Sequence, residues 1–303
     1  MTRGIDCESR ANLAHTVLVP AYNGQLHIAE TLESILAQID LTTQVIVSDD
    51  FSLDNTRSIL QTFLDDERVQ VYYQTRNLGL FENWNFLLGK VQTPTFTLLS
   101  QDDRFAAADA LIRGLTVLRR TAHVSAVFCD LQFIDDDGAV LTRRSFSRHG
   151  LFDPGVAIRQ SLILARNLFG IPLAIRSDVI RYCRFDESLK YLADLEFAFR
   201  VSCHGQPFHI PEPLLQYRIH GSNATTIKQR SMFSDLQKLS HKHALTLTPS
   251  ELVAQRIFGS ASYVGRAAIL RFPLLRRLVF RTHRALVRRA AARTRLRESG
   301  RSP

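Results

Sequence analysis

The N-terminal part of the chain alternates short apolar runs with amphipathic stretches of about ten residues. Runs that are apolar at every position are typical of strands that are covered on both faces. The predicted strands are His15–Pro20, Gln44–Ser48, Val69–Tyr73, Thr95–Ser100 and Ser125–Phe133. The predicted helices between them are Ile28–Gln38, Asn55–Leu64, Leu80–Lys90 and Ala107–Arg120. This alternation predicts an α/β fold with a mostly parallel central sheet, flanked by helices and joined by right-handed crossovers.

The pattern becomes less regular after the fifth predicted strand. A turn is predicted at Asp135–Gly138, a helix at Leu192–Cys203 and a strand at Pro211–Ile219. From Gln229 onward the pattern is helical. We therefore expect a main domain over residues 1–228 and a helical C-terminal arm over residues 229–303.

The positive charge of the chain is confined to this arm. The net charge is +9, yet residues 253–303 hold 13 Arg, no Lys and one acid, which gives 13 − 1 = +12 and leaves −3 for the rest. No apolar run approaches the roughly 18–20 residues that span a bilayer. The N-terminus has no apolar signal-peptide core, and the four Cys are scattered without CxxC spacing. These features predict a cytosolic protein with reduced thiols and a basic arm.

Polar residues follow the predicted parallel strands, where each strand ends. Asn23 follows the first strand, Asp49 and Asp50 the second, and Asn77 the third. The pair Asp102 and Asp103 follows the fourth. Ligands of open α/β sheets bind outside the carboxyl ends of the strands. The sequence thus predicts a binding site at this edge.

Each acidic pair has a functional and a structural interpretation. Asp102 and Asp103 could hold a divalent cation such as Mg²⁺ or Mn²⁺, or they could form a solvated turn with a helix cap. One carboxylate of Asp49 and Asp50 could accept a hydrogen bond from a base N–H or a ribose hydroxyl, or it could cap the following helix.

Two further groups of side chains are candidates for chemistry. Asp194 lies at the start of a predicted helix, where a carboxylate could act as a general base or simply stabilise the helix N-terminus, and Glu196 lies close behind it. Arg218 and His220 are two residues apart on one strand face, where they could contact a phosphate or a diphosphate.

Six of these segments together resemble a known family. They are Val17–Gly24 (VLVPAYNG), Val45–Thr56 (VIVSDDFSLDNT), Arg76–Asn85 (RNLGLFENWN), Leu98–Asp103 (LLSQDD), Leu192–Arg200 (LADLEFAFR) and Tyr217–Thr225 (YRIHGSNAT). In this order and spacing they are similar to the inverting family 2 glycosyltransferases with the GT-A fold, of the bacterial cell-surface polysaccharide type. The resemblance covers about residues 14–225.

The resemblance implies a donor site for a nucleotide sugar. The residues that match donor-binding positions are Pro20, Ala21, Tyr22, Asp50, Asn77, Gly79, Asn85, Asp102 and Arg218. Of these, Asp50 would accept the N3–H of uracil or thymine, Asp102 would contact the ribose or the sugar, and Arg218 would contact the diphosphate. The donor implied is a UDP- or dTDP-sugar. We expect the choice of sugar to depend on loops around Phe105, Ile171 and Pro172.

The resemblance also implies a metal and a base. Asp103 would bind the Mg²⁺ or Mn²⁺ that bridges the donor diphosphate, His220 matches a position that contacts metal or diphosphate, and Asp194 matches the catalytic base. Three positions depart from the family pattern: Gln101 where an acid is frequent, Asn83-Trp84-Asn85 where Ala-Arg-Asn is frequent, and Ala193 where a second acid precedes the base.

The arm has four interpretations. From Leu274, one helical face carries Leu275, Leu278, Val279, Thr282 and Leu286, and the opposite face carries Arg277, Arg281, Arg284 and Arg288. Such a helix suits the surface of an anionic membrane. Alternatively its apolar face packs on the main domain, its Arg residues bind nucleic acid, or residues 293–303 form a disordered tail. We favour the membrane surface and expect no nucleic acid partner.

The sequence as a whole predicts a metal-dependent inverting glycosyltransferase. It would transfer the sugar of a UDP- or dTDP-sugar to a glycan acceptor on the inner face of the cytoplasmic membrane, and we expect that acceptor to be a lipid-linked saccharide. One alternative is a polyprenyl-phosphate glycosyl synthase. Another is a non-catalytic subunit that binds a sugar nucleotide or a glycan, an interpretation that Gln101 keeps open.

Overall fold

The computed structural model describes residues 14–39, 42–146, 149–220 and 231–260. The strands are β1 (Ala14–Ala21), β2 (Thr42–Asp49), β3 (Val69–Tyr73), β4 (Thr95–Leu98), β5 (Arg104–Phe105), β6 (Val124–Ile134), β7 (Val140–Arg144), β8 (Gly150–Leu151), β9 (Pro172–Arg176) and β10 (Gln206–Arg218). The helices are α1 (Ile28–Leu36), α2 (Thr56–Gln61), α3 (Leu80–Leu88), α4 (Ala110–Arg120), α5 (Pro154–Leu164), the 3₁₀ helix η2 (Ser177–Arg181), α6 (Ala193–Cys203), α8 (Met232–Lys242) and α9 (Pro249–Ser260).

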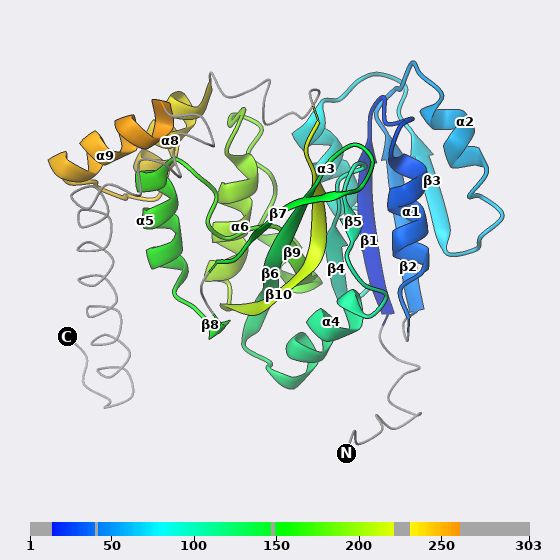
Figure 1. The fold of residues 1–303 in the computed structure, drawn as a ribbon, viewed down its shortest axis with the longest axis horizontal. Coiled ribbons are helices and arrows are strands. Elements are labelled where there is room, and N and C mark those ends of the chain that lie inside the picture. Colours follow the sequence, from blue (N-terminus) through cyan, green and yellow to red (C-terminus); the bar gives the residue numbers. More distant parts are fainter. Residues whose placement is uncertain (1–13, 40–41, 147–148, 221–230, 261–303) are drawn as a thin grey trace.

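The strands form one sheet in the order β3-β2-β1-β4-β9-β6-β10-β5 (Figure 1). The half made of β3, β2, β1 and β4 is parallel throughout, as predicted. Beyond β4 the sheet is mixed, because β9 runs antiparallel to both β4 and β6, while β6 and β10 are parallel. The α/β class is confirmed, and the antiparallel strands are the part that the apolar pattern did not predict.

Both faces of the sheet are covered by helices. Residues of β1 alternate between two cores. Val17 and Val19 belong to the core that includes residues of α1, α2 and α4, and Leu18 belongs to the core that includes residues of α3, α5 and α6. A strand with two buried faces has no polar alternation, which explains its continuous apolar run. In α1, the buried residues Ile28, Leu32 and Ile35 recur every three to four positions and share one helical face.

Helix α5 and strand β9 lie in the stretch that was predicted as irregular. Helix α5 begins after Asp153, whose carboxylate accepts the N–H groups of Gly155 and Val156 at 2.7 and 3.1 Å. An Asp before Pro154 is a recognisable helix start. Strand β9 begins at Pro172, which is buried, and Phe105 is buried in β5. Ile171 precedes β9, and the expected role of the segments around these residues in the choice of sugar stays a prediction.

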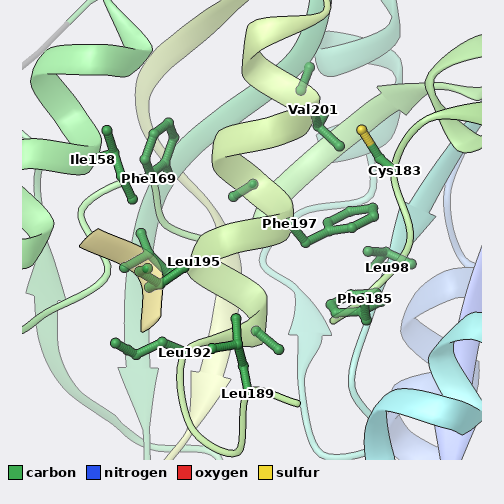
Figure 2. Packing of buried hydrophobic residues seen from close by; sticks show 14 of the residues in the cluster. Leu98, Ile158, Phe169, Cys183, Phe185, Leu189, Leu192, Leu195, Phe197 and Val201 are labelled. Atoms are coloured by element: carbon green, nitrogen blue, oxygen red, sulfur yellow. The ribbon is translucent and has the colours of Figure 1, made fainter. Parts of the chain in front are cut away.

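The core of the main domain continues into the residues that we assigned to the arm. Met232, Leu236 and Leu239 of α8 are buried in the same cluster as Leu195 and Phe197 of α6. Figure 2 shows Leu195, Phe197 and Val201 of α6 within this core, with Phe169 and Phe185 close by. The Phe185 and Phe197 rings stack at 4.3 Å. This packing fixes the position of α6 and of its first turn, which carries Asp194.

Helix α9 is attached to α5 by an ion pair, in which Arg159 Nη2 lies 2.6 Å from Glu251 Oε2. In Figure 1, α5, α6, α8 and α9 lie together at one end of the molecule, away from α1 and α2. Within the described residues, no helix has the length and apolarity that crossing a bilayer requires. The predictions for residues 221–225 of the last motif and for the arm beyond residue 260 lie outside the described ranges.

Candidate active site

The segments that follow the first three parallel strands lie side by side. The Asp50 N–H donates to the Ala21 carbonyl at 2.7 Å, and the Gln74 N–H donates to the Asp49 carbonyl at 2.8 Å. The Asn23 side chain accepts the N–H of Leu53 at 2.9 Å. The polar residues at the strand ends thus meet at one edge, as the sequence predicted.

Asp50 organises the turn that leads into α3. Its two carboxylate oxygens accept the N–H groups of Leu78 and Gly79 at 2.6 and 2.8 Å, and its carbonyl accepts from the Asn77 amide at 3.3 Å. Gly79 has a φ of +88°, which a glycine adopts without strain. Three of the predicted donor-binding residues, Asp50, Asn77 and Gly79, are therefore joined by hydrogen bonds. Because each carboxylate oxygen can accept more than one hydrogen bond, the predicted bond from a base N3–H to Asp50 stays a prediction.

Asp49, the other member of this acidic pair, is structural. Its buried carboxylate accepts from Arg57 Nε at 2.6 Å and from the Ser52 N–H at 3.3 Å. The Arg57 guanidinium also lies 5.5 Å from the ring centres of both Phe51 and Tyr73. This contact helps hold Phe51 at a φ of 64°, a conformation that bulky residues seldom adopt.

Gln101 is bonded to the backbone of Tyr22. Its amide accepts the Tyr22 N–H at 2.8 Å and donates to the Tyr22 carbonyl at 3.0 Å. A Cβ on Gly24 would lie 2.2 Å from Gln101 Oε1, so this close approach depends on glycine. Pro20 and Ala21 are buried in β1, whereas the Tyr22 side chain is 45% exposed. Gln101 therefore braces the loop that presents Tyr22.

Asp102, Asp103 and His220 form a second polar group at this edge. His220 Nε2 lies 2.8 Å from Asp102 Oδ2, and Asp103 Oδ1 accepts the Arg218 N–H at 3.0 Å. Asp103 is buried, and its burial together with the neighbouring Asp102 charge raises its pKa well above the usual range, against the influence of Arg218. The second pair of acids is thus brought together with His220, as predicted.

The structure shows the buried Arg218 side chain bonded to protein groups, which leaves its predicted contact with the donor diphosphate a prediction. Arg218 is 1% exposed, and Nε donates to the Asp102 carbonyl at 3.1 Å. Nη1 donates to the carbonyls of Asp135 and Asp136 at 2.7 and 2.8 Å, and Nη2 pairs with Glu30. A guanidinium held in this way joins α1, the Asp102 loop and the β6–β7 turn. Its bonds hold the segment that carries Asp102 and Asp103.

The donor set at Asp102, Asp103 and His220 fits part of a Mg²⁺ or Mn²⁺ site. Carboxylate oxygens suit both ions, and an imidazole suits Mn²⁺. A cation would also offset the cost of holding Asp103 ionised next to Asp102. Within the described residues, no three His, Cys, Asp or Glu side chains converge as a metal cage. The remaining ligands of a cation would have to come from a bound diphosphate and water.

Asp194 lies in the first turn of α6, exposed to solvent. Its Oδ2 accepts from the Asn167 amide at 3.0 Å. Asn167 precedes β9, and β9 runs antiparallel to β4 with Thr95 opposite Arg176. Since β9 begins where β4 ends, Asp194 belongs to the same edge as Asp102 and Asp103. The protein around Asp194 raises its pKa by desolvation, and the Asn167 bond opposes this.

Glu196, the other acid of this helix, has a different environment. Its buried Oε1 lies 2.7 Å from Arg200 Nε, 3.0 Å from Lys242 Nζ and 3.2 Å from His243 Nε2. Burial acts to raise the pKa of Glu196, but the His243 bond and the two cations outweigh it and lower the pKa. Glu196 thus attaches α6 to α8, which leaves Asp194 as the candidate base.

Asn85 is bonded to the segment before α6. Its amide donates to the Phe185 carbonyl at 3.0 Å and accepts the Phe185 N–H at 2.8 Å. It also donates to Glu187 at 2.9 Å. The structure gives Asn85 no contact with Asp50 or its turn, so its predicted part in donor binding stays a prediction.

Sequence analysis missed three residues of the site. Glu30 pairs with Arg218, Asn167 bonds Asp194, and the His27 ring lies 5.6 Å from the His220 ring. Burial and the nearby Arg218 and His220 lower the pKa of His27. Of the three, only Asn167 could have been recognised from the sequence, because the spacing of Asn167 and Gly170 is typical of a turn capped by an Asn side chain.

The mixed sheet, its helical layers and the acidic groups at its carboxyl edge define a glycosyltransferase of the GT-A fold. The pattern of glycosyl transferase family 2 matches residues 16–184. Because the match spans more than half of the chain, the protein belongs to this family, as the resemblance implied.

Relatives and solved structures agree with this assignment. A Campylobacter jejuni protein named GalNAc(5)-diNAcBac-PP-undecaprenol beta-1,3-glucosyltransferase is 33% identical over 217 residues, which cover 70% of this chain and 67% of that protein. S. aureus TarS 1–349 in complex with UDP-GlcNAc has a TM-score of 0.63 at 18% identity, covering 84% of this chain and 72% of that chain. Mannosyltransferase PcManGT from Pyrobaculum calidifontis, in complex with GDP-Man and Mn²⁺, has a TM-score of 0.55 at 16% identity, covering 88% and 83%. The two structures show a shared fold.

Proposed function

We propose that the protein is a metal-dependent inverting glycosyltransferase that moves a sugar from a UDP- or dTDP-sugar to a glycan acceptor. The observation that carries the proposal is the meeting of three acidic sites at one edge of the sheet. Asp50 lies with the Leu78–Gly79 turn, Asp102 and Asp103 lie with His220, and Asp194 lies in the first turn of α6.

The nucleotide part of the donor is assigned to Asp50 and Tyr22. Asp50 would accept a base N3–H, which uracil and thymine carry. Tyr22, exposed and braced by Gln101, offers an aromatic face beside the base or the ribose. The UDP-GlcNAc bound to TarS supports a uridine donor, whereas the GDP-Man bound to PcManGT shows that the fold also accepts guanosine.

The diphosphate part of the donor is assigned to the second acidic site. Asp103 and His220 would hold the cation, and Asp102 would contact the ribose or the sugar. A bound Mg²⁺ or Mn²⁺ would neutralise the charge that develops on the departing nucleoside diphosphate. Arg218 keeps Asp103 in place through its backbone N–H.

Asp194 is assigned as the general base. It would take the proton from the acceptor hydroxyl while that oxygen attacks the anomeric carbon from the face opposite the diphosphate, which inverts the configuration. A carboxylate with a pKa above the usual Asp range is a stronger base toward a hydroxyl proton than an ordinary surface Asp.

The acceptor is proposed to be a saccharide carried on a lipid. The name of the C. jejuni relative includes an undecaprenol diphosphate saccharide, which supports this choice over a polyprenyl-phosphate acceptor. We further propose that residues 274–303 hold the enzyme on the inner face of the cytoplasmic membrane. Deleting them should release the protein from anionic liposomes, and retention of the shortened protein would contradict this part of the proposal.

We favour an enzyme over a non-catalytic subunit that binds a sugar nucleotide or a glycan. That alternative depended on Gln101, where the family frequently has an acid. Because Gln101 bonds both backbone groups of Tyr22, its presence has a positioning explanation that leaves Asp102 and Asp103 available.

Release of UDP or dTDP from nucleotide sugars, in Mn²⁺ and in EDTA, tests the proposal. We expect Mn²⁺-dependent turnover that Asp103→Asn and Asp194→Asn each reduce by about 100-fold or more. Asp66→Asn is the matched control, since Asp66 precedes β3 at the opposite edge of the sheet. Full activity in both site variants would contradict the assigned roles.

A further inference from the structure

Asn167, in the turn between α5 and β9, has an amide whose orientation is fixed. Its Oδ1 accepts the N–H groups of Phe169 and Gly170 at 2.9 and 3.2 Å. Turning the amide over would bring its NH₂ group toward both of these donors. The Nδ2 group must therefore point the other way, where it donates to Asp194 Oδ2 at 3.0 Å.

The turn that carries Asn167 is itself held from two sides. From α5, the Ser161 hydroxyl accepts the Leu168 N–H at 3.0 Å. From the end of β7, Arg144 donates to the Asn167 carbonyl, and its guanidinium lies 4.6 Å from the centre of the Phe146 ring. A Cβ on Gly170 would lie 2.8 Å from that ring, so the backbone packs closely there. Asn167 is consequently a rigid partner for Asp194.

A rigid N–H donor has two effects on an exposed carboxylate. It removes the rotational freedom of the carboxylate, and it stabilises the charged form more than the neutral form. The Arg144 charge acts in the same direction as Asn167, while desolvation acts against both. Asn167 touches neither of the acidic sites assigned to the donor, so its effect must pass through Asp194.

We propose that Asn167 is a positioning residue, which fixes the orientation of the Asp194 carboxylate and favours its ionised form, so that Asp194 can accept the proton of the acceptor hydroxyl. This inference rests on the proposed function of Asp194. It assigns a role in base catalysis to a turn 27 residues before the base.

Two substitutions separate this role from a role in shaping the turn. Asn167→Asp and Asn167→Ser each keep an oxygen that can accept the Phe169 and Gly170 N–H groups. Neither keeps the N–H donor, because Asp has none and the Ser side chain ends one atom earlier. Ser161→Ala is the matched control, since it removes a bond to the same turn without touching Asp194.

The first measurement is the pH dependence of nucleotide release from UDP-GlcNAc with Mn²⁺. We expect both Asn167 variants to lower kcat about tenfold or more, with the donor KM within about twofold of wild type. The acid limb of kcat should move to higher pH, further in Asn167→Asp than in Asn167→Ser. Ser161→Ala should keep the wild-type pH profile. Wild-type kcat and pH profile in both Asn167 variants would overturn the inference.

A second measurement needs no turnover and keeps the two proposals distinguishable. The carboxyl ¹³C resonance of Asp194, identified by its loss in Asp194→Asn, is titrated in wild type and in both Asn167 variants. A midpoint at higher pH in the variants supports the inference, and an unchanged midpoint overturns it. If Asp194→Asn instead keeps full activity, the base assignment itself fails, whatever the midpoints are.

Discussion

Replacing Arg218 with methionine is expected to destabilise the fold strongly, because the guanidinium is buried in a network of acceptors. The substitution keeps much of the side-chain volume and removes every donor. Three carbonyl oxygens, those of Asp102, Asp135 and Asp136, would lose the guanidinium as a donor, and the Glu30 carboxylate would keep only its ion pair with Arg104.

The size of the effect follows from these acceptors. A buried carbonyl left without a partner costs about 1 kcal/mol or more, but Asp136 is exposed and Asp102 and Asp135 are half-buried, so we expect about 2 kcal/mol for the three. The Glu30 side chain is 38% exposed, so water can solvate it and its loss adds about 1 kcal/mol at most. We expect the free energy of unfolding to fall by about 2–3 kcal/mol in Arg218→Met. Arg218→Lys should recover about half, because an ammonium cannot reach four acceptors in this fork geometry.

Urea unfolding followed by circular dichroism measures this loss. Arg68→Met is the control, because Arg68 forms an exposed pair with Asp66 at the opposite edge, worth about 1 kcal/mol at most. If Arg218→Met unfolds like Arg68→Met and loses only its affinity for UDP, the guanidinium contacts the diphosphate. That result would refute the positioning role and restore the role predicted from the sequence.

The remaining predictions concern Gln101, two glycines and Asp103. Gln101→Ala should raise the donor KM about tenfold with little change in kcat, because the substitution removes only the two bonds that hold the Tyr22 backbone. A loss of kcat with an unchanged KM would contradict this role of Gln101. Gly24→Ala should produce the same increase in KM, because the added Cβ would displace the Gln101 amide. At Gly79 a Cβ would meet open space, so Gly79→Ala should mainly lower the free energy of unfolding, by about 1 kcal/mol, because of the positive φ at this position. Asp103→Asn should stabilise the metal-free protein at pH 7 and not at pH 3. The pKa of Asp103 is higher in the folded protein than in the unfolded chain, so ionisation of this carboxyl lowers the stability of the folded state as the pH rises from the usual Asp pKa to the raised pKa. Asn cannot ionise and avoids this loss. Thermal unfolding at both pH values checks this, and a loss of stability at pH 7 would contradict it.

The parallel half of the sheet was predictable because each strand is buried on both faces. Strand β3 begins and ends at the predicted residues Val69 and Tyr73, and β1 and β2 differ from prediction by only one or two residues at each end. The polar residues after these strands could be assigned to one edge for the same reason, since parallel strands share a direction.

The mixed half of the sheet depends on contacts between segments that are far apart in the sequence, which the local pattern of apolar and polar residues does not predict. Strand β9 is five residues long and starts with a proline, and its place between β4 and β6 follows from pairing across the chain. Arg218 and His220 share a sequence motif but differ in environment. Arg218 is buried because the β6–β7 turn, 82 and 83 residues earlier in the sequence, covers it. The pattern of apolar and polar residues along β10 does not predict this contact.

We propose that Asp50 and Asp103 form one donor site for a pyrimidine nucleotide and a divalent cation. Thermal unfolding of the full chain with UDP, dTDP and GDP, each with Mn²⁺ and with EDTA, tests it most directly, because a ligand that binds the native state raises the melting temperature. We expect an Mn²⁺-dependent rise with UDP or dTDP, no rise with GDP, and no rise with any nucleotide in Asp103→Asn. Stabilisation by GDP that equals that by UDP, or an undiminished UDP effect in Asp103→Asn, would contradict it.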